Sequence, residues 1–252
     1  MVKPKKRLGQ HFLKDENIAR KVISSLSGKY PDILEIGAGT GVLSKYLLKD
    51  PFYNPRFFEI DPESVQFLQL NYPGIGNKII EKDFLEYDLN EFPAPIVIIG
   101  NFPYNISSQI LFKVLEYRNS IPEVVGMFQK EVAERIASPP GSKKYGILSV
   151  LMQAYYRISY LFTVSENVFY PKPKVKSAVL SMTRNEIARL DCDEDIFLKV
   201  VKTGFNQRRK TLRNSLKVLS LKENPQVSKL LSKRAEQLNV MDFVALAQQI
   251  QF

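Results

Sequence analysis

The sequence is poor in the side chains that carry most acid–base, thiol and metal chemistry in enzymes. Its 252 residues include one cysteine, Cys192, and one histidine, His11. A single cysteine excludes an internal disulfide, and these two residues cannot form a Cys/His zinc site. Nothing around His11 suggests a Ser-His-Asp triad. The chemistry must therefore run without imidazole, thiolate or metal, or must use a cofactor.

Long apolar runs are also missing. None approaches the roughly 18–20 residues of a membrane span, and no signal-peptide core follows the basic start MVKPKKRLGQHFLKDE. With 44% hydrophobic residues the chain can still bury a sizeable core. We therefore expect a soluble, cytoplasmic protein without membrane contact. No apolar surface repeat suggests an oligomer, so we expect a monomer.

Acidic residues are scarce relative to basic ones. The chain has 26 Asp and Glu against 36 Lys and Arg, a formal net charge of +10. Such an excess favours a polyanionic partner, most often nucleic acid, although an enzyme can also simply be basic. The charge is clustered, since residues 202–222 contain seven basic residues and no acid. Two further basic clusters lie in residues 1–7 and 170–184.

Short apolar runs alternate with segments of helical spacing in the first two thirds of the chain. This alternation predicts an α/β fold, a parallel sheet with helices on both faces. Runs near 160–164 and 177–183 could extend the sheet. The predicted strands are 32–37, 56–61, 78–84, 95–101 and 123–129, and the predicted helices are 41–49, 62–71 and 107–117.

The character of the sequence changes after Arg184. The segments 197–205, 208–221 and 227–238 have helical spacing, and no convincing strand lies among them. We therefore predict two domains, an α/β domain over residues 1–184 and a small all-helical domain over residues 185–252.

Glycines and acids follow the predicted strands. Gly37, Gly39 and Gly41 separate the first strand from its helix, where glycine allows a sharp turn and close approach to a ligand. The acids Glu35, Glu59 and Asp83 end three successive strands, and Phe84 follows the last of them. Each signal alone is weak. Together they lie at the strand ends where open α/β sheets bind ligands.

This pattern indicates the type of ligand. No lysine follows the glycines as in a phosphate-binding P-loop, and acids repel phosphate. An acid such as Glu59 can accept both hydroxyls of a ribose, and Asp83 can accept from an adenine amino group. S-adenosylmethionine has an amine, a ribose and an adenine, so we predict it as the cofactor.

The segment IIGNFPYNIS ends a strand with Asn101, Phe102, Pro103 and Tyr104. The Asn101 amide oxygen and the Phe102 carbonyl can accept from an exocyclic amine, Pro103 stiffens the turn, and Tyr104 can stack on a base. Stacking contributes about 1–3 kcal/mol per base. The alternative is a plain strand-to-helix turn, capped by Asn105 or Ser107, with Tyr104 in the core. The glycine loop earlier on the same sheet favours the functional reading.

Seven segments together resemble one protein family. They are RLGQHFL (7–13), EIGAGTG (35–41), NFPYNIS (101–107), QKEVAERI (129–136), YGILSV (145–150), FYPKPKVKSAV (169–179) and FNQRRKTLRNSL (205–216). In this order they resemble the small-subunit ribosomal RNA adenine dimethyltransferases, the KsgA family. Many adenine methyltransferases share NFPY and EIGAGTG, whereas GQHFL and RRKTLRNSL are more specific.

The resemblance implies a Rossmann-like, seven-stranded class I methyltransferase sheet with a helical C-terminal domain. It implies dimethylation of N6 on two adjacent adenosines in the 3′-terminal hairpin of 16S rRNA, within a maturing small ribosomal subunit. His11 and Phe102 stand where the family often has Asn and Leu.

Three groups of site residues follow from the motifs and the resemblance. We expect the catalytic residues to be Asn101, Phe102, Pro103 and Tyr104. The expected cofactor residues are His11, Leu13, Glu35, Gly37, Gly39, Gly41, Glu59, Asp83, Phe84 and Asn101. The expected RNA-binding residues are Lys5, Lys6, Arg7, Lys172, Lys174, Arg208, Arg209, Lys210 and Arg213. We further expect Arg209, Arg213 and Lys217 to line one helical face. We expect no metal.

Three alternatives remain open. An Erm-type enzyme would dimethylate large-subunit rRNA, but RRKTLRNSL argues against it. A DNA adenine methyltransferase would more often carry two prolines in its motif. An assembly factor whose main role is to bind pre-ribosomal subunits is a further possibility, and that role can coexist with catalysis.

Overall fold

The computed structural model describes residues 2–222 and 224–250. The chain forms two compact units. The first contains the residues up to Ala133 together with Ser159–Arg184, and the second contains Glu134–Ile158 together with the residues from Asn185. The predicted boundary after Arg184 therefore coincides with a unit boundary. Residues 134–158, which the sequence placed in the first domain, group instead with the C-terminal helices.

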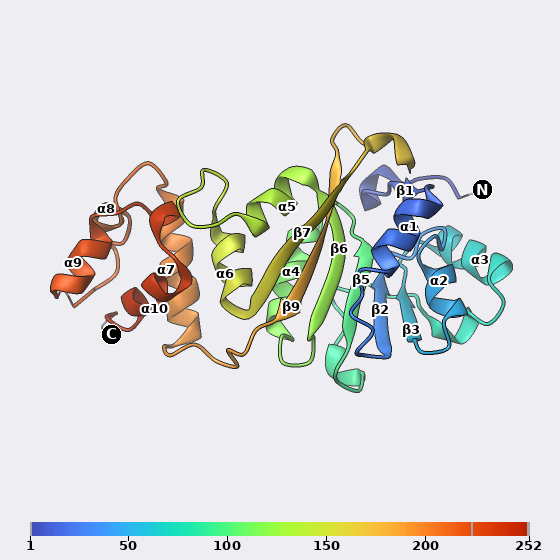
Figure 1. Cartoon of the computed structure of the whole chain (residues 1–252), viewed down its shortest axis with the longest axis horizontal. Coiled ribbons are helices and arrows are strands. Elements are labelled where there is room, and N and C mark those ends of the chain that lie inside the picture. The colour runs from blue at the N-terminus through green and yellow to red at the C-terminus, as the bar shows by residue number, and fades with distance from the viewer. Residues whose placement is uncertain (1, 223, 251–252) are drawn as a thin grey trace. The chain divides into compact units, whose positions relative to one another are not determined.

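A seven-stranded sheet forms the centre of the α/β fold, in the order β4-β3-β2-β5-β6-β9-β7 (Figure 1). Strands β4, β3, β2, β5 and β6 pair in parallel, and β9 pairs antiparallel with β6. The predicted strands all occur, and both later runs join the sheet. Their bounds are β2 (Asp32–Ile36), β3 (Asn54–Phe58), β4 (Ile79–Ile80), β5 (Val97–Asn101), β6 (Glu123–Gln129), β7 (Tyr156–Val164) and β9 (Ser177–Arg184).

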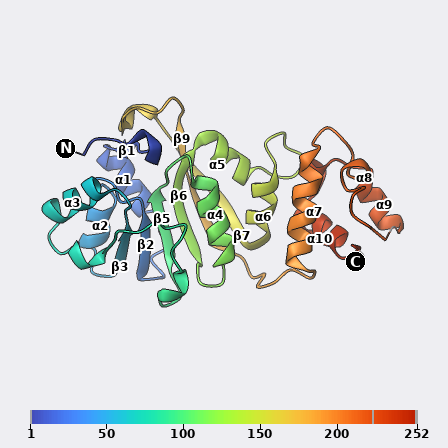
Figure 2. The same ribbon diagram turned by 180° about the vertical axis from the view of Figure 1, so that it is seen from behind.

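Helices cover both faces of this sheet, as predicted. Helix α1 (Glu16–Ile23) lies over one face (Figure 1), and α4 (Ser107–Glu116) lies over the other (Figure 2). The helices α2 (Ser44–Lys49) and α3 (Pro62–Asn71) connect the parallel strands, and α5 (Lys130–Ala137) follows β6. Pro62 stands in the first turn of α3, where its missing N–H costs nothing.

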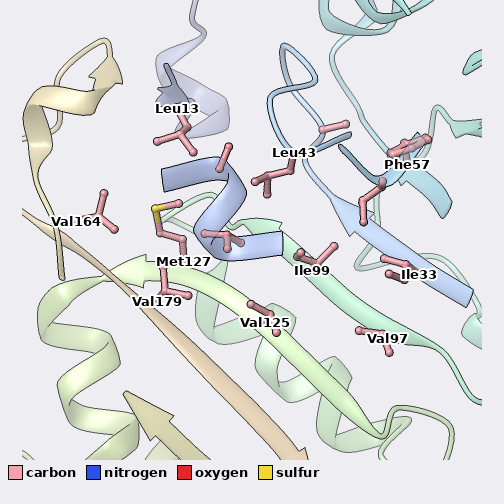
Figure 3. Close-up of a cluster of buried hydrophobic side chains, with 14 of the residues drawn as sticks. Leu13, Ile33, Leu43, Phe57, Val97, Ile99, Val125, Met127, Val164 and Val179 are labelled. Carbon is pink, nitrogen blue, oxygen red and sulfur yellow. The ribbon is translucent and has the colours of Figure 1, made fainter. Parts of the chain in front are cut away.

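The core explains why the strands read as continuous apolar runs. Val97 and Ile99 on β5, and Val125 and Met127 on β6, point to the same face and belong to one buried cluster (Figure 3). The cluster also takes in residues of α1, among them Val22. Because helices cover both faces of the sheet, the side chains on both sides of the inner parallel strands are mostly buried and apolar.

The order of the sheet fixes where a ligand can bind. The chain moves outward from β2 through β3 to β4, then returns to place β5 on the other side of β2. In open α/β sheets the ligand crevice lies at such a reversal, beyond the carboxyl ends of the strands. Glu35 pairs with Ile99 across this junction, so the glycine turn and Asn101 emerge side by side.

In this first unit one expectation about local structure is wrong, and one short strand was not predicted. The predicted strand 78–84 is only two residues long, so Asp83 and Phe84 lie in a loop beyond it. The N-terminal residues, for which no strand was predicted, form β1 (Phe12–Leu13), which pairs antiparallel with β8 (Phe169–Tyr170). That pairing joins segments more than 150 residues apart, which local patterns do not encode.

The second unit is helical over its C-terminal part. Its helices are α6 (Ile147–Tyr155), α7 (Glu194–Asn206), α8 (Leu212–Ser215), α9 (Pro225–Leu231) and α10 (Val240–Ala247). Helix α6 is apolar on most sides and packs against α7 and α10, which explains why residues 134–158 belong to this unit.

The predicted helix 208–221 is mostly absent. Helix α7 ends at Asn206, Thr211 is extended, and only Leu212–Ser215 is helical. Arg209 and Lys217 lie outside α8, so the expectation that they line one helical face with Arg213 is wrong. The buried Leu212 donates its N–H to the Lys233 carbonyl oxygen at 2.8 Å. This tertiary bond starts a new short helix where the local pattern favoured a continuous one.

No helix within the described residues is long and apolar enough to cross a membrane. The described part of the chain also holds no cluster of three or more His, Cys, Asp or Glu side chains with metal-binding geometry.

Candidate active site

A tight glycine turn follows β2 and forms the floor of a pocket in the first unit. Gly37, Gly39 and Gly41 all have positive φ angles, at 72°, 56° and 78°. A side chain at Gly39 would meet the Phe12 ring, and one at Gly41 would meet the Tyr72 ring. All three positions favour glycine for backbone conformation, and Gly39 and Gly41 also favour it for space.

The acid after β3 is fixed to this turn. Glu59 is buried, and its Oε2 accepts the Gly39 N–H at 2.7 Å. Its Oε1 accepts the Asp61 N–H at 2.9 Å. Burial raises the pKa of Glu59, while these backbone N–H groups oppose that shift. Glu59 thus ties the strand end to the glycine turn and lines the pocket.

Asp61 links this acid to the N-terminal segment. Its fully buried carboxylate accepts from Lys5 Nζ, from Gln10 Nε2 at 3.1 Å and from Ser64 Oγ at 3.1 Å. Burial alone would raise the pKa of Asp61, but these hydrogen bonds hold it below its usual value. These bonds therefore hold the segment that contains Gln10 and His11 beside the pocket.

Glu35 is the most perturbed acid of the site. It is 2% exposed, and within the described residues its Oε2 has no hydrogen-bond partner. Burial raises the pKa of Glu35 to about 8. The Ser44 hydroxyl opposes this shift, and the charge of the nearby Glu59 adds to it. Glu35 lines a small recess with Leu13, Gly37 and Asn101. A bound ammonium group would supply the donor that this carboxyl lacks.

Asp83 and Phe84 lie in the loop after β4 and line the pocket opposite the glycine turn. Asp83 Oδ1 accepts the Leu85 N–H at 2.8 Å, which leaves its other oxygen for a ligand. The buried Phe84 ring packs edge-on against Phe58, at 5.4 Å between ring centroids. An aromatic wall beside a carboxylate acceptor suits an adenine ring with its amino group.

Asn101 is oriented by a contact that the sequence did not reveal. Its Nδ2 donates to the His11 carbonyl oxygen at 2.8 Å. Because the amide nitrogen is held there, the amide oxygen is left as an acceptor. The backbone of β5 pairs with β6 up to Asn101, so the side chain starts from a rigid strand.

The next three residues shape the rest of the turn. The Phe102 ring is buried in space left by Gly126, where any side chain would collide with it. Pro103 and Tyr104 both line the pocket. Tyr104 is half-buried and its hydroxyl bonds to Ser177 Oγ, so it is neither fully in the core nor free. Its ring therefore has a fixed orientation.

His11 contributes in two ways. Its Nδ1 lies 2.7 Å from the Pro171 carbonyl oxygen, so this nitrogen carries the proton and donates. Its ring stacks near Tyr104, with 5.4 Å between centroids and 29° between planes. Leu13 follows in β1 and is buried. The residues that line the pocket thus come from five separate segments of the sequence, within 8–12, 36–39, 58–60, 82–84 and 101–106.

The chemistry of these residues fits S-adenosylmethionine. The buried Oε2 of Glu35, which has no hydrogen-bond partner within the described residues, suits the ammonium group of the methionine end. A glycine turn that admits no side chains suits close contact with the ligand. Glu59 suits the ribose, and Asp83 with Phe84 suits the adenine. Every predicted cofactor residue except Gly41 lines one of the two adjoining recesses. Gly41 lies under Tyr72 instead.

A family model described as "Ribosomal RNA adenine dimethylase" matches residues 1–251. The chain belongs to the ribosomal RNA adenine dimethylase family. The resemblance found in the motifs is thereby confirmed. Membership makes this dimethylase an S-adenosylmethionine-dependent rRNA adenine dimethyltransferase.

Curated relatives of this dimethylase match along almost their whole length. "Ribosomal RNA small subunit methyltransferase A" of Flavobacterium johnsoniae is 59% identical, covering 99% of this chain and 97% of the relative. The protein of the same description from Cytophaga hutchinsonii is 54% identical, covering 97% of this chain and 96% of the relative.

Solved structures agree with the fold of the dimethylase. A dimethyladenosine transferase from Plasmodium falciparum aligns with a TM-score of 0.80 and 26% identity, over 96% of this chain and 100% of that one. The 23S rRNA methyltransferase ErmE aligns with a TM-score of 0.69 and 23% identity, over 94% and 100% of the two chains. The second likeness shows the shared fold alone.

The predicted RNA-binding residues of the dimethylase fall into two groups, one in each unit. In the first unit, Lys6 and Arg7 are exposed in the turn before β1, and Lys172 and Lys174 are exposed just after β8. The β1–β8 pairing places these two segments together. Lys5 differs, since its ammonium group pairs with Asp61 and Glu63.

In the second unit, Arg209 and Lys210 are exposed after α7, and Arg213 is exposed on α8. Arg208 has another task. Its guanidinium donates to the Lys143 carbonyl oxygen and, at 3.3 Å, to that of Tyr145. Arg208 therefore stabilises the loop before α6.

Several residues at the site were missed. Gln10 and Phe12 lie within the motif RLGQHFL (7–13), so that motif already contained a signal for them. Lys113 carries no local signal, because its partners are 26 and 28 residues away. Asp61 and Ser177 lie in segments that the patterns single out, but their bonds to Lys5 and Tyr104 join distant parts of the chain.

Proposed function

We propose that this dimethylase transfers methyl groups from S-adenosylmethionine to N6 of two adjacent adenosines in the 3′-terminal hairpin of 16S rRNA. The substrate is a maturing small ribosomal subunit, and the enzyme acts as a cytoplasmic monomer. The small-subunit assignment is supported by the curated relatives, which are named small-subunit methyltransferases and align over nearly the whole chain.

The observation that carries the proposed chemistry is the hydrogen bond between Asn101 Nδ2 and the His11 carbonyl oxygen. It fixes the amide so that its oxygen accepts an N–H of the target amine. Accepting that bond favours a pyramidal nitrogen with its lone pair exposed. S-adenosylmethionine supplies the methyl group when bound. No strong base is required, and positioning and electrostatics make the main contributions.

Tyr104 holds the target base in this proposal. The bond from its hydroxyl to Ser177 fixes the ring beside Asn101. A target adenine must be unpaired or flipped from its helix to reach this ring. The exposed basic residues near β1 and β8 would then contact the RNA backbone next to the pocket.

The function is tested by methylation with radiolabelled S-adenosylmethionine. The acceptors are undermethylated small subunits, large-subunit rRNA and duplex DNA. We expect incorporation only into small subunits, with dimethyladenosine recovered at two adjacent positions. Incorporation into large-subunit rRNA would establish the Erm-type alternative instead.

Binding without methylation would favour the assembly-factor alternative. A tight complex with undermethylated small subunits that incorporates no label would contradict the enzymatic proposal. The Asn101→Ala variant is the reference here, because it should bind subunits and fail to methylate them.

A further inference from the structure

Lys113 is a charged side chain buried in the helix that follows the Asn101–Tyr104 turn. It lies on α4, is 8% exposed, and has the buried Ile110 and Val114 as neighbours on that helix. Lysine is almost never buried to this degree unless specific partners hold it.

The partners of Lys113 are backbone oxygens of one loop. Its Nζ donates to the Leu85 carbonyl oxygen at 2.9 Å and to the Tyr87 carbonyl oxygen. The Phe84 ring centroid lies 5.5 Å from the same nitrogen. Burial lowers the pKa of Lys113, although Glu116, Asp83 and Asp88 partly oppose the shift. An apolar residue would avoid this desolvation, so the charge has a specific role in tying down the loop.

The loop that Lys113 holds is the one that carries Asp83 and Phe84. Leu85 is fixed at both ends, because its N–H donates to Asp83 Oδ1 at 2.8 Å and its carbonyl accepts from Lys113. Release of the Leu85 carbonyl would therefore free the backbone that orients the Asp83 carboxylate. The same helix is tied to the catalytic turn, since Ser107 Oγ donates to the Tyr104 carbonyl oxygen at 3.2 Å.

We infer that Lys113 is a positioning residue for cofactor recognition, which fixes the loop 83–87 so that Asp83 and Phe84 meet the adenine of S-adenosylmethionine. This inference rests on the proposed function of that pocket. It assigns the adenine selectivity of the site to a residue outside the pocket, on the helix that also anchors the methyl-acceptor side.

The test measures discrimination between two ligands rather than affinity alone. S-adenosylhomocysteine carries an amino group on its base, where S-inosylhomocysteine carries a carbonyl oxygen. Asp83 would accept a hydrogen bond from the amino group. Titration calorimetry should show that wild type binds S-adenosylhomocysteine about 10-fold or more tighter than S-inosylhomocysteine. With the second ligand the Asp83 carboxylate would face the carbonyl oxygen of the base, which is unfavourable. The variant Lys113→Met keeps the chain length and lacks the donors. We expect it to lose at least two thirds of that discrimination.

Two variants control this experiment. Lys49→Met removes an exposed lysine at the end of α2, outside the lining of the pocket, and it should keep wild-type discrimination. Asp83→Asn should lose discrimination directly. Urea unfolding confirms that each variant folds, and Lys113→Gln replaces Lys113→Met if the latter does not.

The outcomes separate the two proposals. If Asp83→Asn loses discrimination and Lys113→Met retains it, the inference about Lys113 is wrong and the adenine site stands. If wild type itself does not discriminate, the adenine site at Asp83 is wrong, and the role of Lys113 falls with it.

Discussion

At the scale of single residues, the site depends on polar side chains that form hydrogen bonds to residues far away in the sequence. Asn101 donates to His11, and Asp61 accepts from Gln10. Each bond occupies one polar atom of the side chain. The other polar atom of the same group stays available for a second partner. In Asn101, for example, the bond from Nδ2 to the His11 carbonyl oxygen sets the direction in which the amide oxygen points.

The first prediction concerns Asn101. Asn101→Ala should reduce single-turnover methylation of small subunits by about 100-fold or more, as for loss of a group that stabilises a transition state. Binding of subunits, measured by filter retention, should change little because a large surface carries it. Asn71→Ala, at the exposed end of α3, is the control. Methylation at the wild-type rate would remove Asn101 from the chemistry.

The second prediction concerns the pH dependence of stability through Glu35. Its pKa is about 8 in the folded protein, above the ordinary value near 4.3 of an unfolded chain. Between about pH 5 and 8 the unfolded state releases this proton and the folded state keeps it. Glu35 therefore makes stability fall as pH rises, by at most about 1.4 kcal/mol per pH unit.

Glu35→Gln should remove this contribution. Urea unfolding at pH 5.5, 6.5 and 7.5 should show that the variant gains stability relative to wild type as pH rises. Glu16→Gln is the control, because hydrogen bonds from Lys45 and Tyr46 lower the pKa of Glu16. Parallel stability curves for Glu35→Gln and wild type would mean that Glu35 is ionised in the fold.

At the scale of elements, the N-terminal segment 5–13 is held against the rest of the first unit by side-chain and strand contacts. We call this segment the strap. Residues 5–13 contribute the turn before β1, the pairing with β8 and the contacts to Asp61. They have few strand or helix bonds of their own, so their position depends on those contacts. Segments held in this way open more easily than the core.

The third prediction concerns this strap. Lys5→Gln breaks the ion pair to Asp61 and should increase hydrogen exchange in residues 5–11. It should also speed dissociation of S-adenosylmethionine several-fold, measured by stopped flow. Asp61→Asn keeps the helix cap, and combined with Lys5→Gln it should add little further effect.

The control is the Lys45–Glu16 pair, in which the lysine has a similar exposure, 25% against 26% for Lys5. Lys45→Gln should leave cofactor dissociation unchanged. Additive effects of the Lys5 and Asp61 variants would show that these residues act independently and that no strap exists.

At the scale of the whole molecule, the net charge of +10 is the main long-range feature. The exposed part of that charge is distributed over both units, and each unit keeps basic residues whose ammonium or guanidinium groups reach solvent. Phosphate binding by such groups releases counterions, which makes affinity depend on salt.

The fourth prediction concerns the second unit. Replacing Arg209 and Lys210 together by Gln should weaken binding to small subunits and reduce the log–log salt slope by roughly 0.7–0.9 per lost contact. The exchange Arg209→Lys with Lys210→Arg keeps the charge and should keep the slope. Binding of S-adenosylmethionine should not change in either variant. Equal slopes for the Gln variant and wild type would mean that these residues do not contact RNA.

The sequence by itself determined the α/β fold, the approximate positions of the strands and the types of residue near the pocket. These follow from local patterns, because apolar runs become buried strands and a glycine turn after a strand is favoured by backbone conformation alone. The order of the strands then brings the ends of β2 and β5 together. For this reason the sequence alone predicted that Glu35, Gly37 and Asn101 lie near one another, and in the structure all three line one recess.

Only the tertiary structure decided how those residues are held. The contacts of His11 with Asn101, Lys5 with Asp61 and Lys113 with the loop after β4 each join residues 26 or more positions apart. The same holds for the break in the predicted helix 208–221, which follows from the bond between Leu212 and Lys233. A local pattern records which side chains are buried, whereas their partners depend on how distant segments pack.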